Sequence, residues 1–312
     1  MQSVQGTIHV YSGPSGPKLT CFEFGQEPLD QVVLFVAGLT DGYMSVPYLD
    51  TLSNSLKNLG WGLVQAHIRS SYFGYGVGSL DKDIDDLSKC VSFLRTKSHK
   101  RKVVLMGHST GSQNVVHYLL SNYTSGTTAI DAGIAQAPVS DREGMLPSND
   151  KEREKWERWL SKSSELIKNG NSRELMEREA GDATGGAPIT AYRFNSLIGI
   201  GGDDDYFSSD LPAEKIDATW AGIAAKNIPI LILEGEKDEY VPTTIDKVQL
   251  ISSWRNSFTK WFKEENQNVI GKFVIVKGAN HKVDGKEAQT ELVNYVVDFL
   301  MKNFKPKTAN SL

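Results

Sequence analysis

Six short aliphatic runs, separated by segments of helical periodicity, constrain the fold of this chain more than any other feature. The runs occupy residues 31–38, 60–68, 102–107, 132–139, 228–235 and 272–278. Because they are aliphatic at consecutive positions, we expect both faces of each strand to be buried, as in a parallel sheet covered by helices on both sides. The alternation therefore predicts an α/β fold.

Helical patterns fill the intervals between these runs. Four leucines recur at helical spacing within residues 46–59, and Gly60 supplies a stop. Residues 79–95 begin with a Ser79 cap and an acidic first turn, which the positive end of the helix dipole favours. Further elements are expected as an antiparallel strand pair at 7–12 and 19–24 and as helices at 111–121 and 286–303.

One long interval contains no strong aliphatic strand. It runs from about residue 146 to 225 and carries a charged helix with Trp156 and Trp159 on its apolar side. Since it falls between two core strands, we expect a lid over a site rather than a separate domain, and we treat residues 1–312 as one domain. The other aromatic residues expected to help cover a pocket are Tyr192, Phe194, Tyr206 and Phe207.

Composition excludes several classes of function. The net charge of −4 and the pI near 5.9 argue against a nucleic-acid partner. No apolar stretch reaches the roughly 20 residues of a membrane span, and the first ten residues lack the pattern of a secretory signal. Cys21 and Cys90 have no metal-site or disulfide-framework spacing, and the adjacent aspartates 203–205 lack the alternation of a calcium loop. We therefore expect a cytoplasmic protein without a metal.

Residues 107–111, Gly-His-Ser-Thr-Gly, lie where a predicted strand gives way to a predicted helix. A sharp turn there would present Ser109 Oγ above the sheet. It would also bring the backbone so close that any residue larger than glycine at 107 and 111 would clash. This arrangement is typical of a nucleophilic serine.

A nucleophilic serine needs a base and an acid that orients the base. Of the six histidines, His281 follows a late core strand and fits the Ser–acid–His chain order of this arrangement, whereas His108 is expected to serve in packing. The acid should follow the preceding strand, where Asp238 lies just beyond the strand end. Glu236 is the first alternative, and Asp141, after an earlier strand, is a more distant one.

Two backbone N–H groups are expected to stabilise the oxyanion. One belongs to Thr110, the residue after the serine. The other belongs to Leu39, in the turn after the first core strand, where Gly38 permits a close approach. The residues expected to contact substrate are Gly38, Arg69, Ser70 and Tyr72.

Several stretches resemble α/β-hydrolases, and more narrowly a fungal and plant subfamily that includes the fungal fusarinine C esterase. They are GLTDGYMSVPY (38–48), RSSYFGYGVGSL (69–80), GHSTG and AYRFNSLIGIGGDDDYFSSD (191–210). The resemblance implies a mostly parallel sheet flanked by helices with an inserted lid, a triad of Ser109, Asp238 and His281, and no cofactor. It implies a serine esterase acting on a small-molecule ester, with the ester bonds of a fusarinine-type hydroxamate siderophore as one substrate. The alternatives are a general carboxylesterase of small esters and a non-catalytic receptor on the same scaffold.

Overall fold

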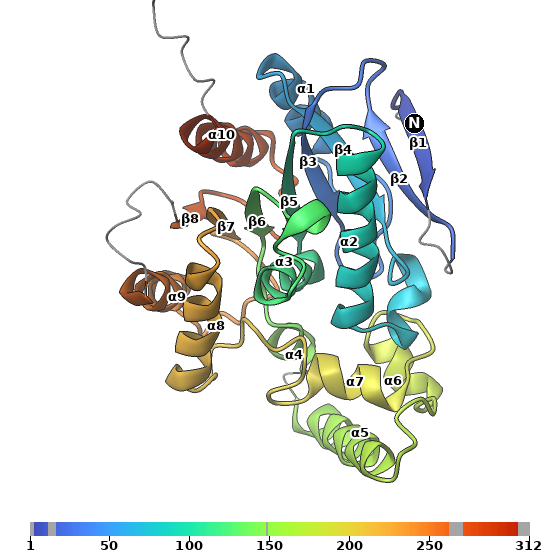
Figure 1. The fold of residues 1–312 in the computed structure, drawn as a ribbon. Coiled ribbons are helices and arrows are strands. Elements are labelled where there is room, and N and C mark those ends of the chain that lie inside the picture. The colour runs from blue at the N-terminus through green and yellow to red at the C-terminus, as the bar shows by residue number, and fades with distance from the viewer. Residues whose placement is uncertain (1–2, 12–16, 148, 262–270, 305–312) are drawn as a thin grey trace, which may run out of the picture.

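A mixed β-sheet organises the molecule in the computed structural model, which describes residues 3–11, 17–147, 149–261 and 271–304 (Figure 1). The strands of these residues form one eight-stranded sheet in the order β1-β2-β4-β3-β5-β6-β7-β8. Their bounds are β1 (Gly6–Tyr11), β2 (Leu19–Phe24), β3 (Gln31–Val36), β4 (Gly62–His67), β5 (Lys102–His108), β6 (Ala132–Gln136), β7 (Ile230–Gly235) and β8 (Gly271–Val276). The pairs β1–β2 and β2–β4 are antiparallel, and the other neighbouring pairs are parallel. The predicted α/β architecture and its antiparallel start are confirmed; residue 12 of the first predicted strand lies outside the described residues.

Helices cover both faces of the sheet (Figure 1). One face packs against α1 (Leu49–Asn58) and α10 (Lys286–Asn303), with Leu52 and Leu292 in the shared core. The other face packs against α2 (Leu80–Thr96), α3 (Thr110–Leu120), α8 (Ala213–Ala225) and α9 (Lys247–Trp261). Ser79 caps α2 as predicted, because its hydroxyl accepts a hydrogen bond from the Lys82 backbone N–H at 3.2 Å. None of the helices in the described residues is long and apolar enough to span a membrane.

A helical cap lies beyond the carboxyl ends of the parallel strands (Figure 1). Its helices are α4 (Asp141–Met145), α5 (Asp150–Lys168), α6 (Arg178–Ala183) and α7 (Ala191–Ile198), and α7 contacts the 3-10 helix η1 (Tyr72–Val77). A second 3-10 helix, η2 (Gly126–Thr128), lies outside the cap and precedes β6. The cap has its own hydrophobic core, in which Trp156 and Trp159 pack against Phe194 with ring centroids 5.9 and 6.1 Å apart. The cap core is therefore a cluster separate from the two that cover the faces of the sheet.

The cap is shorter than the predicted interval of 146–225. Helix α8 packs against α9 and the sheet, and its Trp220 stacks on Trp254 with ring centroids 5.7 Å apart, both side chains being fully buried. Phe207 joins the same core. Because the apolar surface of α8 is buried by the sheet layer, we place the end of the cap before α8 and not at residue 225.

Candidate active site

The turn after β5 holds Ser109 in a conformation that non-glycine residues rarely adopt, with φ 56° and ψ −123°. The glycines on either side make this turn possible. A Cβ at Gly107 would lie 1.9 Å from the carbonyl oxygen of Gly111, and a Cβ at Gly111 would lie 2.6 Å from the carbonyl oxygen of Val36. The strand-to-helix turn therefore requires glycine at both positions, and it raises the serine above the sheet.

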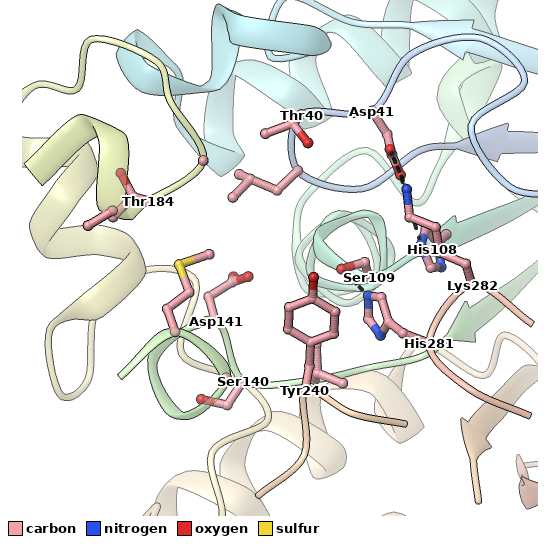
Figure 2. Close-up of a pocket in the computed structure, with 16 residues that line it drawn as sticks. Thr40, Asp41, His108, Ser109, Ser140, Asp141, Thr184, Tyr240, His281 and Lys282 are labelled. Atoms are coloured by element: carbon pink, nitrogen blue, oxygen red, sulfur yellow. Dashed lines mark hydrogen bonds and ion pairs between the residues drawn. The ribbon is translucent and has the colours of Figure 1, made fainter. Parts of the chain in front are cut away.

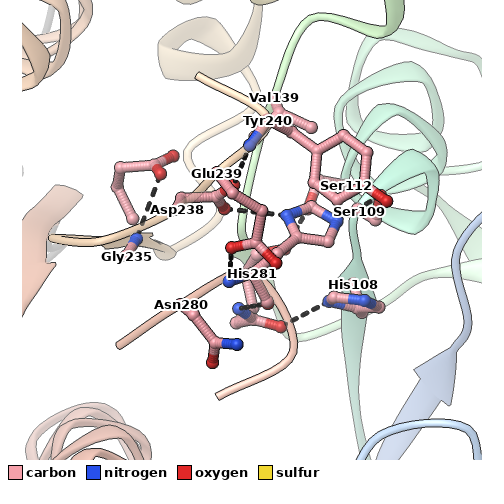
Figure 3. A network of polar contacts seen from close by, with 12 residues as sticks. His108, Ser109, Ser112, Val139, Gly235, Asp238, Glu239, Tyr240, Asn280 and His281 are labelled. Carbon is pink, nitrogen blue, oxygen red and sulfur yellow. Dashed lines mark hydrogen bonds and ion pairs between the residues drawn. The ribbon is translucent and has the colours of Figure 1, made fainter. Parts of the chain in front are cut away.

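Three side chains from three strand ends meet at this turn (Figure 3). His281 Nε2 lies 2.9 Å from Ser109 Oγ, and His281 Nδ1 lies 2.8 Å from Asp238 Oδ2. Since a carboxylate oxygen accepts, Nδ1 carries the ring proton, and Nε2 is free to accept from the serine hydroxyl. The other oxygen of Asp238 accepts from the backbone N–H of Tyr240 at 3.0 Å. The three residues predicted as a triad therefore lie in a series, each within hydrogen-bond distance of the next.

The alternative acids point elsewhere. Glu236 accepts from the Gly278 backbone N–H at 2.7 Å, and Asp141 accepts from Gln113 Nε2 at 2.8 Å. Glu234, inside β7, is buried; burial, and then the nearby Asp238, raise its pKa well above the usual value. None of these three carboxyl groups hydrogen-bonds to the imidazole within the described residues.

A buried polar group supports His281 from behind. Gln136 Nε2 donates to the carbonyl oxygen of His281 at 3.3 Å, and Gln136 Oε1 accepts from the hydroxyl of Tyr48 at 2.8 Å. His108 Nδ1 lies 2.7 Å from the same Gln136 oxygen (Figure 3). Burial, and then the neighbouring His281, lower the pKa of His108 well below its usual value. His108 is therefore a neutral group that braces the site and does not contact the serine hydroxyl.

The backbone N–H groups predicted to bind the oxyanion are those of Leu39 and Thr110. Neither Leu39 nor Thr110 donates its backbone N–H to any group in the part of the chain that the structure describes. Thr110 is the first residue of α3, where an N–H has no partner within its own helix. Gly38 allows the neighbouring turn to approach, because a Cβ there would lie 2.8 Å from Ser109 Cβ. Both N–H groups therefore lack an acceptor among the described residues.

A cavity of about 270 Å³ opens in front of Ser109 (Figure 2). Strand-end loops contribute Thr40, Asp41, Tyr240 and Lys282, and the cap contributes Asp141, Met145 and Thr184. Lys282 Nζ donates to Asp41 Oδ1 at 3.1 Å, so this lysine and this aspartate neutralise each other at the wall. The cavity thus combines apolar surface with a few placed polar groups, as binding sites for small molecules do.

None of the four residues predicted to contact substrate lines this cavity. Arg69 Nε donates to Asp86 at 2.8 Å, and the hydroxyl of buried Ser70 donates to Asp83. Tyr72 is half exposed. The Tyr72 hydroxyl accepts from the backbone N–H of Tyr43 at 3.3 Å. All three side chains therefore have partners in neighbouring segments and lie outside the cavity. Gly38 instead lets the turn after β3 approach Ser109, because a Cβ at this position would lie 2.8 Å from Ser109 Cβ.

Several residues of the cavity were not singled out from the sequence, among them Tyr240, Asp41 and Lys282. Tyr240 packs its ring 4.5 Å from the ring of His281, measured between centroids, while Asp41 and Lys282 form the ion pair at the wall. Each lies one or two residues after a predicted site residue: Asp238, Leu39 or His281. Their position in the same strand-end loops could therefore have predicted that they line the cavity. Thr184 comes from the cap and has no such signal.

The predicted lid aromatics also lie away from the cavity. Phe194 is in the core of the cap and Phe207 in the core of the sheet layer. The hydroxyl of Tyr192 donates to Asp203 at 2.6 Å, and the hydroxyl of Tyr206 lies 2.6 Å from His117 Nδ1. Small and flexible side chains of the cap, not its aromatic rings, face the serine.

The chain matches a described protein family over nearly its whole length. The family whose description reads "Protein of unknown function (DUF1749)" matches residues 1–301. The chain belongs to this family. The predicted resemblance to a subfamily of α/β-hydrolases is confirmed by its relatives.

Two curated relatives cover most of the chain. A UPF0613 protein of Schizosaccharomyces pombe is 37% identical over 285 residues, 86% of each chain. The fusarinine C esterase sidJ of Aspergillus fumigatus is 31% identical over 333 residues, which cover 86% of this chain and 88% of that protein.

Solved structures share the fold. The siderophore hydrolase EstB from Aspergillus fumigatus superposes with a TM-score of 0.80 at 28% identity, covering 97% of this chain and 99% of that one. At 16% identity, Est1E from Butyrivibrio proteoclasticus superposes with a TM-score of 0.58, covering 96% and 99% of the two chains. This member of the DUF1749 family therefore has the α/β-hydrolase fold, and it has relatives that are named esterases.

Proposed function

We propose that this protein is a serine esterase that hydrolyses carboxylic esters through an acyl-enzyme. The observation that carries the proposal is the hydrogen-bonded series of Ser109 Oγ, the His281 imidazole and the Asp238 carboxyl group, with distances of 2.9 and 2.8 Å. This series stands at the wall of a cavity, on a turn built for an exposed serine. Relatives named esterases support the same reaction class.

Acylation follows from this geometry. Ser109 Oγ attacks the ester carbonyl carbon while its proton passes to His281 Nε2, which lies 2.9 Å away. Asp238 holds the ring in the required tautomer and stabilises the imidazolium that forms. The imidazolium then gives the proton to the leaving alcohol as the carbon–oxygen bond breaks, and the acyl group remains on the serine.

Deacylation uses the same groups in reverse. A water molecule attacks the acyl carbon, His281 takes its proton and returns it to Ser109, and the acid is released. In both steps, the N–H groups of Leu39 and Thr110 stabilise the negative charge on the carbonyl oxygen. Each such donor contributes about 2.7–4 kcal/mol to transition-state stabilisation in comparable enzymes. No step requires a cofactor.

Within the esters, we propose a fusarinine-type hydroxamate siderophore as the physiological substrate class. The support comes from two relatives that span most of the chain, the fusarinine C esterase sidJ and the siderophore hydrolase EstB. A cavity of about 270 Å³ encloses the scissile ester and its nearest groups, and the polar groups Thr40, Asp41 and Lys282 suit a hydrophilic remainder.

Covalent labelling tests the reaction class. A fluorophosphonate should add one label per chain at Ser109, and Ser109→Ala should lose both the label and esterase activity. Unchanged turnover in the alanine variant contradicts the proposal. Labelling at Ser109 without hydrolysis across a broad ester panel favours a receptor on this scaffold.

A comparison of substrates tests the finer proposal. We expect kcat/KM to be higher for a hydroxyornithine-based hydroxamate ester than for a short acyl ester of equal intrinsic reactivity, because only the larger substrate uses remote binding energy. A clear preference for the small ester leaves a general carboxylesterase.

A further inference from the structure

Asp141 is a buried acid in the wall of the cavity that the proposed mechanism does not use. It is the first residue of α4 and only 7% exposed. One of its oxygens accepts from Gln113 Nε2 at 2.8 Å, and the residue lines the cavity. Figure 2 shows its carboxyl group projecting from the cap side into the space in front of Ser109. The second oxygen has no hydrogen-bond donor among the described residues.

No basic side chain of the described residues forms an ion pair with Asp141. Two neighbouring arginines form ion pairs with other acids. Arg193 Nη1 donates to Asp204 at 2.6 Å, and Arg142 binds Asp210. Burial, and then Asp204, raise the pKa of Asp141 well above its usual value, while Arg193 opposes the shift. The protein therefore buries a carboxyl group here without giving it a counterion.

The other acid of the cavity shows the contrast. Asp41 already has a cation, since Lys282 Nζ lies 3.1 Å from its Oδ1. A buried carboxylate without such a partner is costly, and it becomes favourable when a ligand supplies the positive charge. Asp141, on the cap side of the cavity, therefore offers a carboxyl group with which a ligand cation could pair.

We propose that Asp141 recognises a protonated amine carried by the ester substrate, so that the preferred substrates are esters of amino acids or of amino alcohols. The inference rests on the proposed esterase function and adds the charge of its substrate. Asp141 is a specificity residue here, because it touches the ammonium group and takes no part in breaking the ester bond. An Asp141 that is protonated in the free protein releases its proton to solvent when the ammonium binds.

Matched ester pairs test this role. The probes are the ethyl esters of glycine, β-alanine and 6-aminohexanoic acid, each paired with the unsubstituted alkanoate ester of equal length. 6-Aminohexyl acetate and heptyl acetate form the corresponding pair on the alcohol side. We expect the best ammonium ester to exceed its neutral partner in kcat/KM by about tenfold or more, as for a hydrogen bond to a charged group.

Asp141→Asn keeps the shape and the contact with Gln113 but removes the charge. In this variant the ratio of kcat/KM for the ammonium ester to that for the neutral ester should fall to about one. The control Asp203→Asn removes an equal charge from an exposed position in the same cap and should keep the preference. Loss of preference in both variants, or equal loss on both esters in Asp141→Asn, overturns the proposal.

The pH dependence of the ratio is an independent readout. Effects of pH on the chemical step that both esters of a pair share cancel in the ratio. The charged groups around Asp141 are Arg193, Asp204 and Asp205, with Asp41 and Lys282 across the cavity. These groups are present in the wild type and in Asp141→Asn, so the difference between the two profiles isolates Asp141. For the 6-aminohexanoate pair, whose amine stays protonated below about pH 9, we expect the ratio to rise with pH in the wild type and to stay flat in the variant; two parallel profiles contradict the role.

Binding to Ser109→Ala separates this inference from the esterase proposal. Calorimetry with the same ester pairs should give about tenfold tighter binding of the ammonium ester, and Asp141→Asn in the same background should abolish the difference. A binding preference without wild-type turnover supports the role of Asp141 and overturns the esterase. Turnover without any ammonium preference leaves the esterase intact and overturns the role of Asp141.

Discussion

The carboxyl group of Asp238 is held from two sides, by Nδ1 of His281 at 2.8 Å and by the backbone N–H of Tyr240 at 3.0 Å. The first contact orients the imidazole toward Ser109, and the second fixes the carboxyl group itself. The side chain of Tyr240 also packs against the imidazole ring. The loop after β7 therefore positions the proposed base through two neighbouring residues.

Asp238→Asn should reduce kcat by about 10⁴-fold, because an amide favours the wrong tautomer of His281. Glu236→Gln is the matched control and should be nearly silent, since Glu236 binds the Gly278 backbone N–H and does not touch the imidazole. Ester hydrolysis measures both, with Tm confirming that each variant is folded. Activity retained in the first variant and lost in the second places the acid at Glu236.

Gly38→Ala should reduce kcat by about 10²–10³-fold, the loss typical of one oxyanion donor. Its new Cβ would lie 2.8 Å from Ser109 Cβ and 3.2 Å from the His108 carbonyl oxygen, so the turn that carries the Leu39 N–H must shift. Gly285→Ala is the control, because a Cβ there meets nothing within 4 Å. Steady-state kinetics and Tm of both variants measure the effect, and wild-type kcat in Gly38→Ala contradicts the oxyanion assignment.

Asp83 makes stability depend on pH near neutrality. Burial raises the pKa of this carboxyl group from 3.8 to about 7. The native state thus holds the proton more tightly than the unfolded state, and the contribution of Asp83 to the free energy of unfolding falls as pH rises from about 4 to about 7.

Asp83→Asn should therefore raise Tm at pH 8 by on the order of 5 °C and leave it almost unchanged at pH 4. The hydroxyl of Ser70 can still donate to the amide oxygen of the variant. Tm measured from pH 4 to 9 for both proteins checks this. A difference in Tm that does not change with pH excludes Asp83 as the titrating group.

Arg193 should be a major contributor to stability. It is 2% exposed and donates to buried Asp204 at 2.6 Å, so Arg193→Met leaves a buried carboxylate without its cation. We expect the free energy of unfolding in urea to fall by about 3–5 kcal/mol. The control Arg178→Met removes an exposed pair with Asp182 and should cost about 0–1 kcal/mol. Equal losses in the two variants contradict this account.

Features that depend on neighbouring residues could be predicted from the sequence. Aliphatic runs identified the parallel strands, and the glycines at 107 and 111 identified the turn that carries Ser109. Chain order identified His281 and Asp238, although the structure had to bring His281 and Ser109 together across 172 residues. The strands and the turn could be predicted because hydrophobic periodicity and the steric freedom of glycine act over a few residues.

The partners of polar side chains and the layer to which each helix belongs were decided by tertiary structure. The sequence placed Arg69 and Ser70 in the pocket, yet α2 presents Asp86 and Asp83 to them. The sequence likewise assigned α8 to the lid, where its Trp220 instead completes the core against the sheet. A charged or aromatic side chain takes the partner that best satisfies its charge or buries its surface, and that partner is fixed only when distant segments have packed.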